Sequence, residues 1–100
     1  MKTNMNRDGG NLTVSLEGRL DTTTAPELEA ELRPALKDGV TNLTIDLKKL
    51  EYVSSAGLRV LLSAQKIMNR QGEMTVRNVG SAIMDVFEVT GFVDLLNIED

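Results

Sequence analysis

The sequence predicts a two-layer α/β domain, built as a mixed sheet of four or five strands with its helices packed on one face. Segments in which apolar and polar residues alternate, typical of strands with one buried face, are interleaved with segments of helical spacing. Strands separated by helices favour parallel pairing through crossover connections. Each strand keeps one polar face, whereas a sheet covered on both sides needs continuous apolar runs. The second face should therefore meet water or a partner.

The clearest strands have an apolar residue at every second position, in residues 11–17, 43–47 and 74–77. Residues 3–6 are expected to pair back onto the first of these as a short edge strand, because the turn sequence RDGGN follows them. A polar loop is expected at 48–51, just before a pair of serines. The apolar tail, 92–98, is expected to dock as a last short element.

The first helix is expected to begin at Thr24, with Glu27 completing a capping box and a proline in the first turn. Its buried face is expected to consist of leucines four residues apart: Leu28, Leu32 and Leu36. Pro34 lies inside this pattern and should kink the helix or split it near Leu32. The KDG sequence at 37–39 should end it.

Two more helices follow. The apolar residues from the serines to Arg70 have helical spacing, and Gly72 is placed to cap the C-terminus of that helix. A third helix is expected to be capped by Ser81 and closed by Gly91.

Bulk composition restricts the function classes. The net charge of −4, the few aromatic residues and the lack of a basic stripe argue against nucleic-acid binding. The absence of cysteine excludes a disulfide framework, and no apolar run approaches the ~18–20 residues that span a bilayer. The N-terminus lacks the hydrophobic stretch of a secretory signal. We therefore expect one cytoplasmic domain over residues 1–100, monomeric when free and not inserted in a membrane.

The residues give little support to catalysis. The chain has no histidine, which removes Ser-His-Asp and Cys-His arrangements and the commonest zinc ligand. Lys66 lies eleven residues beyond Ser55 on the same expected helix, about 16 Å along its axis, too far for a serine–lysine dyad. The chain has no glycine-rich phosphate loop. We expect no enzyme activity, no metal and no cofactor.

The segment YVSSAGLRVLL, residues 52–62, raises the question of what its two serines do. Serine is among the best N-cap residues, so Ser54 or Ser55 could simply cap the helix that follows. A cap does not explain Gly57 in the first turn, where glycine costs about 1 kcal/mol relative to alanine. Glycine at that position allows another backbone or side chain to come close.

Four stretches of the chain, in order and spacing, resemble bacterial anti-sigma factor antagonists, the small single-domain members of the STAS group. LKKLEYVSSAGLRVLL is similar to the family's strand, short loop, Asp-Ser-Ser/Thr-Gly-Leu and helix. LEGRLDTTTAPEL is similar to its Gly-x-Leu-Asp-x-x-Thr-Ala segment. RQGEMTVRNV resembles its Gly-Gly-x-Leu/Met strand, and AIMDVFEVTGFVDLL its last helix. The resemblance covers nearly the whole chain and implies a STAS-like fold.

The resemblance also implies a switch called partner switching. In the family, the unphosphorylated protein binds an anti-sigma factor that is also a serine kinase, and the sigma factor is released. Phosphorylation of one serine dissolves the complex, and a PPM-type serine phosphatase resets it. Aligning the Gly-Leu pair places Ser55 at the phosphoacceptor and Ser54 where the family has aspartate, which leaves Ser54 as a rival acceptor.

The same resemblance implies a partner-binding surface around the acceptor. Asp21 matches the acidic residue of the family's first loop, although a cap or turn role before the first helix is an equal alternative. Ala56 takes the place of the family's second hydroxyl residue. The surface is expected to comprise Asp21, Thr24, Ser54, Ala56, Gly57, Leu58 and Arg59.

The spacing between Ser55 and Arg59 suggests a role for Arg59 as a hypothesis. Arg59 lies four residues after Ser55, so on a helix the two side chains share a face. Arg59 could pair with the phosphate, or with acidic groups of the partner when Ser55 is bare; the alternative is an exposed arginine worth about 0.5 kcal/mol or less.

Two other function classes remain open at this point. One is a constitutive STAS subunit or scaffold, whose partner would be a transporter ATPase or a signalling assembly and whose binding would not depend on phosphorylation. The other is binding of a nucleotide or lipid at the loop end of the sheet.

Overall fold

The computed structural model describes residues 1–37 and 39–99. Its elements are, in chain order, β1 (Lys2–Asp8), β2 (Asn11–Leu20), α1 (Ala25–Leu36), β3 (Asn42–Val53), α2 (Ser55–Gln71), β4 (Glu73–Arg77), α3 (Ser81–Thr90) and the 3₁₀ turn η1 (Phe92–Asp94). The strands lie in one sheet in the order β1-β2-β3-β4. β1 is antiparallel to β2, whereas β2 with β3 and β3 with β4 are parallel. The predicted mixed sheet is confirmed, and the described residues give it four strands.

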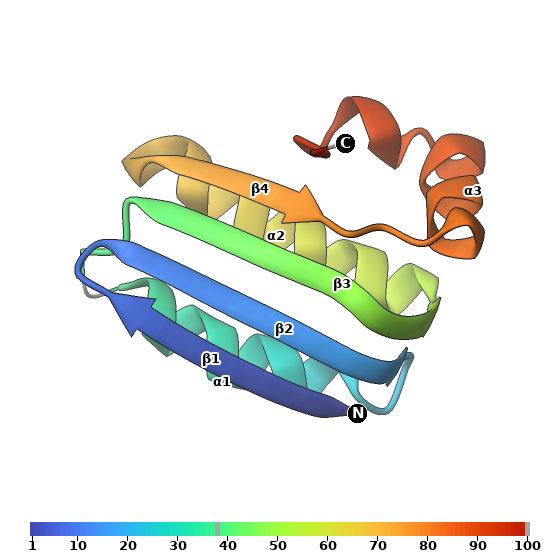
Figure 1. Cartoon of the computed structure of the whole chain (residues 1–100), viewed down its shortest axis with the longest axis horizontal. Helices are drawn as coiled ribbons and strands as arrows, with labels where there is room; N and C mark the ends of the chain where they lie inside the picture. The colour runs from blue at the N-terminus through green and yellow to red at the C-terminus, as the bar shows by residue number, and fades with distance from the viewer. Residues whose placement is uncertain (38, 100) are drawn as a thin grey trace.

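The two layers are visible in Figure 1, where α1 and α2 lie next to each other across one face of the sheet. Alternate strand residues such as Leu12, Val14 and Leu16 are buried beneath these helices, and the residues between them remain part-exposed on the other face. The predicted uncovered face is thus confirmed. α3 lies beyond the C-terminal ends of β3 and β4, with Ile83 and Phe87 buried in the core.

Helix α1 runs unbroken through Pro34, so of the two predicted outcomes, a kink or a split near Leu32, the split is wrong. Pro34 lies in the last turn, where its missing N–H removes only one bond before the helix ends at Leu36. Burial of Leu28, Leu32 and Leu36 holds this turn in place. Lys37 caps the helix through its N–H to the Pro34 carbonyl oxygen, and residue 38 of the predicted terminator lies outside the described residues.

Of the caps predicted at Gly72, Ser81 and Gly91, the two glycines are confirmed. Gly91 ends α3 in the left-handed region, at φ 80°. Gly72 ends α2, but with an extended backbone; glycine is needed because a Cβ there would collide with the Thr41 carbonyl group. The N-cap of α3 is Gly80, with Ser81 as the first helical residue and no side-chain cap, so that prediction is wrong by one residue.

The polar loop predicted at 48–51 is wrong, because β3 continues to Val53. The register shifts twice: Ser15 pairs with Asp46 but Glu17 pairs with Lys49, and the second shift follows Gly18. In both places β3 contributes one residue more than β2, which is a β-bulge. An extra residue breaks the period of two, which explains why the strand pattern fades there. The bulges lie in the half of the sheet that leads to the two serines.

Both ends of the chain join the sheet. β1 is longer than the predicted 3–6 and pairs with β2 from Lys2↔Glu17 to Asp8↔Asn11. The tail docks as predicted, with Ile98 beside Val76 on the outer edge of β4. None of the helices found in residues 1–37 and 39–99 has the length and apolar character that a membrane crossing requires.

Candidate functional site

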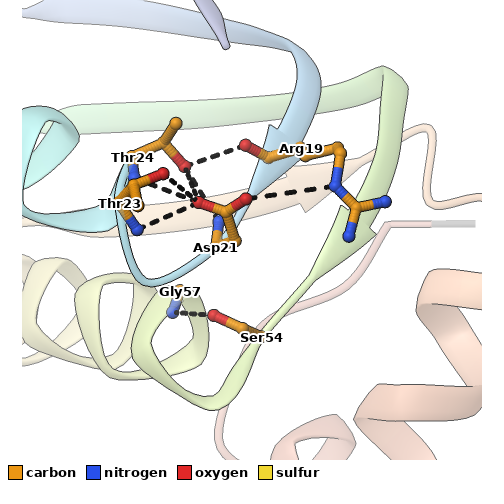
Figure 2. Close-up of polar contacts among 6 residues, drawn as sticks. All are labelled: Arg19, Asp21, Thr23, Thr24, Ser54 and Gly57. Atoms are coloured by element: carbon orange, nitrogen blue, oxygen red, sulfur yellow. Dashed lines mark hydrogen bonds and ion pairs between the residues drawn. The ribbon is translucent and has the colours of Figure 1, made fainter.

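The C-terminal ends of β2 and β3 bring the predicted site residues together. These strands are parallel, so α1 and α2, which follow them, both begin at the same edge of the sheet. Leu20 pairs with Val53, and the Ser54 N–H donates to the Leu20 carbonyl oxygen at 2.9 Å. Asp21 and Ser54, far apart in sequence, are therefore neighbours in space (Figure 2).

Ser54 is the N-cap of α2. Its backbone is extended, its hydroxyl oxygen accepts a hydrogen bond from the Gly57 N–H at 3.3 Å, and its carbonyl oxygen accepts one from the Leu58 N–H at 2.9 Å. The capping interpretation of the serine pair thus holds for Ser54, whose hydroxyl is engaged (Figure 2).

Ser55 is the first residue of α2 and is exposed. Within residues 1–37 and 39–99 its hydroxyl has no hydrogen-bond partner, and neither do the backbone N–H groups of Ser55 and Ala56. Unpaired N–H groups at a helix N-terminus, together with the helix dipole, favour an anion. The one free hydroxyl of the pair therefore lies where a phosphate is stabilised.

Two of the residues predicted to bind the partner are buried. Leu58 is 4% exposed and packs into the core. A Cβ on Gly57 would lie 2.7 Å from Leu20 Cγ and 2.9 Å from the Leu20 carbonyl oxygen, so glycine allows α2 to start against the end of β2. Both residues support the site from beneath rather than line its surface. Ala56 is half-buried, and Arg59 is exposed.

The start of α1 is organised by Asp21. Its Oδ1 accepts hydrogen bonds from the Thr23 hydroxyl at 2.7 Å, from the Thr23 N–H at 3.0 Å and from the Thr24 N–H at 3.2 Å. Thr24 is the N-cap residue, but its hydroxyl accepts from the Asp21 N–H and donates to the Arg19 carbonyl oxygen, both at 2.8 Å. The predicted Thr24–Glu27 capping box is therefore wrong, because the preceding turn already uses the hydroxyl (Figure 2).

These hydrogen bonds change the acidity of Asp21. The Thr23 hydroxyl contributes most, followed by the backbone N–H groups of Thr24 and Thr23, and together they lower the pKa of Asp21 from 3.8 to about 2. Asp21 is thus a turn residue, as one of the two alternatives for it predicted. Its role toward a partner stays a prediction.

Arg59 lies one helical turn after Ser55, as its spacing predicted. In the part of the chain that the structure describes it makes no ion pair. Its pairing with a phosphate or with a partner stays a prediction.

Arg19 and Tyr52 are two residues of this edge that the sequence pattern did not predict. The two residues are paired across β2 and β3, and Arg19 Cζ lies 4.1 Å from the centroid of the Tyr52 ring. Arg19 Nε also lies 3.9 Å from Asp21 Oδ2. Both bulges are needed to bring Tyr52 opposite Arg19, so no local pattern could reveal the contact. The single signal was a tyrosine, the only one in the chain, two residues before Ser54.

The described residues contain no group of three or more acidic side chains placed to hold a metal ion. A hollow of about 250 Å³ lies on the open face of the sheet between β1, β2 and β3, with Lys2, Glu17 and Lys49 among its lining residues. Asp21, Ser54 and Ser55 are not among them. The hollow is therefore separate from the serine pair.

Comparison with known proteins places the chain in a family. A family model described as "Mlab, STAS domain" matches residues 3–97. The chain belongs to the STAS domain family. Among STAS relatives, BtrV of Bordetella bronchiseptica is 36% identical over 99 residues, which cover 98% of this chain and 85% of BtrV. The anti-sigma-B factor antagonist of Staphylococcus aureus is 33% identical over 88 residues, which cover 87% of this chain and 82% of that protein.

Solved structures of STAS proteins share the fold. An anti-sigma factor antagonist from Mycobacterium paratuberculosis is 27% identical, with a TM-score of 0.88 over 97% of this chain and 83% of its own. SpoIIAA in its unphosphorylated form has a TM-score of 0.79 at 17% identity, covering 99% of this chain and 88% of its own. These likenesses confirm the predicted fold class and the STAS resemblance.

Proposed function

We propose that this STAS protein is an anti-sigma factor antagonist switched by phosphorylation of Ser55. In the bare state it binds an anti-sigma factor that is also a serine kinase, and the sigma factor is released. Phosphorylation by that kinase ends the complex, and a PPM-type phosphatase restores the bare serine. The S. aureus relative is named an antagonist of an anti-sigma factor, which supports a regulatory rather than an enzymatic role.

One observation carries the choice of acceptor. Ser54 and Ser55 are adjacent, but Ser54 uses its hydroxyl to cap α2, whereas the Ser55 hydroxyl is exposed and unbonded within the described residues. Phosphorylation of Ser54 would place the phosphate on the oxygen that already accepts from the Gly57 N–H. Phosphorylation of Ser55 disturbs no hydrogen bond within the described residues.

The electrostatics of α2 support a switch without a change of fold. A phosphate adds about −1.5 to −2 charge, which suits a helix N-terminus. SpoIIAA has been solved in unphosphorylated and phosphorylated forms, and this chain matches them with TM-scores of 0.79 and 0.77. These two structures support a switch in which the fold stays the same, and the penalty is expected at the interface, where the new charge must lose its water. A coupling of ~3 kcal/mol changes affinity about 150-fold.

The test measures binding to the anti-sigma factor kinases of the same organism. The wild-type chain and Ser55→Ala should bind one of them, and phosphorylation of Ser55 should weaken that binding by about 100-fold or more. Ser81→Asp is a matched charge control, because Ser81 is also an exposed first residue of a helix. It should leave binding unchanged.

Two results would contradict the proposal. Binding that is equally strong for the bare chain, Ser55→Asp and the phosphorylated chain would favour a constitutive STAS subunit, with a transporter ATPase or signalling assembly as its partner. Equal weakening by Ser55→Asp and Ser81→Asp would mean that net charge, rather than this position, controls binding.

A further inference from the structure

Arg19 and Tyr52 form a shelf at the C-terminal ends of β2 and β3. The guanidinium carbon of Arg19 lies 4.1 Å from the centre of the Tyr52 ring, within the range of a cation–π contact. Its Nε atom lies 3.9 Å from Oδ2 of Asp21 (Figure 2). The ring and the carboxylate thus hold the guanidinium group by one face and one edge.

The other edge of the guanidinium group is open. The side chain of Arg19 is 61% exposed, and Tyr52 is 40% exposed. In residues 1–37 and 39–99, neither Nη atom of Arg19 has a hydrogen bond. Figure 2 shows both Nη atoms turned away from Asp21. The planar guanidinium fork of Arg19 therefore faces solvent.

The ion pair with Asp21 does not neutralise the guanidinium group of Arg19. Oδ1 of Asp21 is occupied by hydrogen bonds from Thr23 and Thr24, and these bonds account for the lowered pKa of Asp21. An exposed ion pair at 3.9 Å contributes little by comparison. The guanidinium group of Arg19 is therefore positioned mainly by the Tyr52 ring and remains able to bind a second anion.

We propose that Arg19, positioned by Tyr52, binds a carboxylate of the protein partner next to the phosphoacceptor. The guanidinium fork matches a carboxylate with two parallel hydrogen bonds, and a side chain already held in place loses less freedom on binding. Arginine and tyrosine are also enriched among residues that dominate interface energies. The shelf adjoins α2, because the Leu20 carbonyl oxygen accepts from the Ser54 N–H. The identity of the partner, an anti-sigma factor, rests on the proposed function.

The first experiment uses the isolated chain and does not depend on the partner. Acetate is titrated against sodium chloride at constant ionic strength while NMR follows the arginine side-chain N–H groups. The resonances of Arg19 should shift with an affinity at least threefold higher than those of Arg70, an exposed arginine at the other end of α2. Tyr52→Leu should reduce Arg19 to the level of Arg70, whereas Tyr52→Phe should keep the difference. Equal responses of Arg19 and Arg70 would overturn the proposal.

The second experiment measures affinity for the anti-sigma factor. Arg19→Ala and Arg19→Lys should each weaken binding at least tenfold, because lysine keeps the charge but not the fork. Tyr52→Leu should weaken it at least threefold, and Tyr52→Phe and Arg70→Ala by less than twofold. Wild-type affinity for Arg19→Lys would overturn the proposal. If the wild-type chain binds no anti-sigma factor, the proposed function fails, while the acetate titration still decides what Arg19 does.

A third experiment tests whether Arg19 binds a carboxylate of the partner or the phosphate on Ser55 of its own chain. Acetate should still bind Arg19 in a chain phosphorylated at Ser55. Loss of acetate binding in that chain would assign the fork to the phosphate and overturn the partner-carboxylate proposal.

Discussion

The N-termini of α1 and α2 begin at the same edge of the sheet but are completed in different ways. At α1, Asp21 and Thr24 satisfy the turn from within through a set of short hydrogen bonds. At α2, one hydrogen bond from the Gly57 N–H to Ser54 closes the cap, and the Ser55 hydroxyl beside it has no partner among the described residues. One helix start is closed, and the other leaves an anion-binding end open.

Because of this difference, the N-termini of α1 and α2 can serve different functions. The closed start of α1 fixes the position of Asp21 and of the neighbouring Arg19. The open start of α2 can accept a charged group without losing an internal bond. The N-terminus of α1 thus keeps its shape, while the neighbouring N-terminus of α2 can be modified. Together they suit a binding surface whose shape stays constant while its charge changes.

The largest effect on the free energy of unfolding is expected from disrupting the close contact between the first turn of α2 and the end of β2. Gly57→Ala would drive a Cβ to 2.7 Å from Leu20 Cγ, and overpacking of this kind costs about 2 kcal/mol of unfolding free energy. Gly80→Ala is the control, since a Cβ at Gly80 would meet nothing within 4 Å and its φ of −69° suits alanine. Urea unfolding measures both, and equal stabilities would refute the close approach.

The next effect tests the closed start of α1. Thr24→Val removes the hydroxyl that accepts from the Asp21 N–H and donates to the Arg19 carbonyl oxygen. We expect a loss of about 1–2 kcal/mol in unfolding free energy, because both groups are left without this partner. Thr22→Val is the matched control, as Thr22 is exposed and has no hydrogen bond in the described part of the chain. Equal unfolding midpoints for the two variants would contradict the network.

A smaller contrast separates the two serines. Ser54→Ala removes the N-cap and should cost about 1 kcal/mol, whereas Ser55→Ala should change stability by less than about 0.5 kcal/mol. Thermal unfolding of the two single variants gives the difference directly. A larger loss for Ser55→Ala would reverse their roles and make Ser54 the free hydroxyl.

The last prediction concerns the loss of a stabilising contribution in acid. The pKa of Asp21 is lowered to about 2 in the folded chain, below its ordinary value of 3.8. Its stabilising contribution is therefore fully present above about pH 4 and is lost as the pH falls through about 2. The stability difference between the wild type and Asp21→Asn should shrink over that interval in urea unfolding at pH 5, 3 and 2. A constant difference would show that the carboxylate charge has no part in the turn.

The sequence predicted the features that depend on local pattern. Alternation at Leu12, Val14 and Leu16 located a strand with one buried face, and the leucines four apart in α1 located the helix face. One serine of the pair Ser54 and Ser55 was predicted as a cap because serine is chemically suited to it, and the structure assigns this role to Ser54. Gly57 was predicted as a place of close approach because alanine would otherwise be preferred.

The features that were missed depend on contacts between distant segments. The bulges of β3 follow from its pairing with β2, so the strand at 48–51 resembled a loop and the Arg19–Tyr52 contact had no local signal. The Thr24 hydroxyl was assigned to a capping box, although the path of the turn directs it to the Arg19 carbonyl oxygen. Helix α1 continues through Pro34 because packing of Leu36 outweighs one lost hydrogen bond.

The central claim is that the free hydroxyl of Ser55, rather than the capping hydroxyl of Ser54, takes the phosphate. Phosphopeptide mass spectrometry of the protein from its own cells, growing and stressed, tests this directly. Phosphate is expected on Ser55, in amounts that differ between the two conditions. Phosphate on Ser54 alone, or no phosphate in either condition, would contradict it.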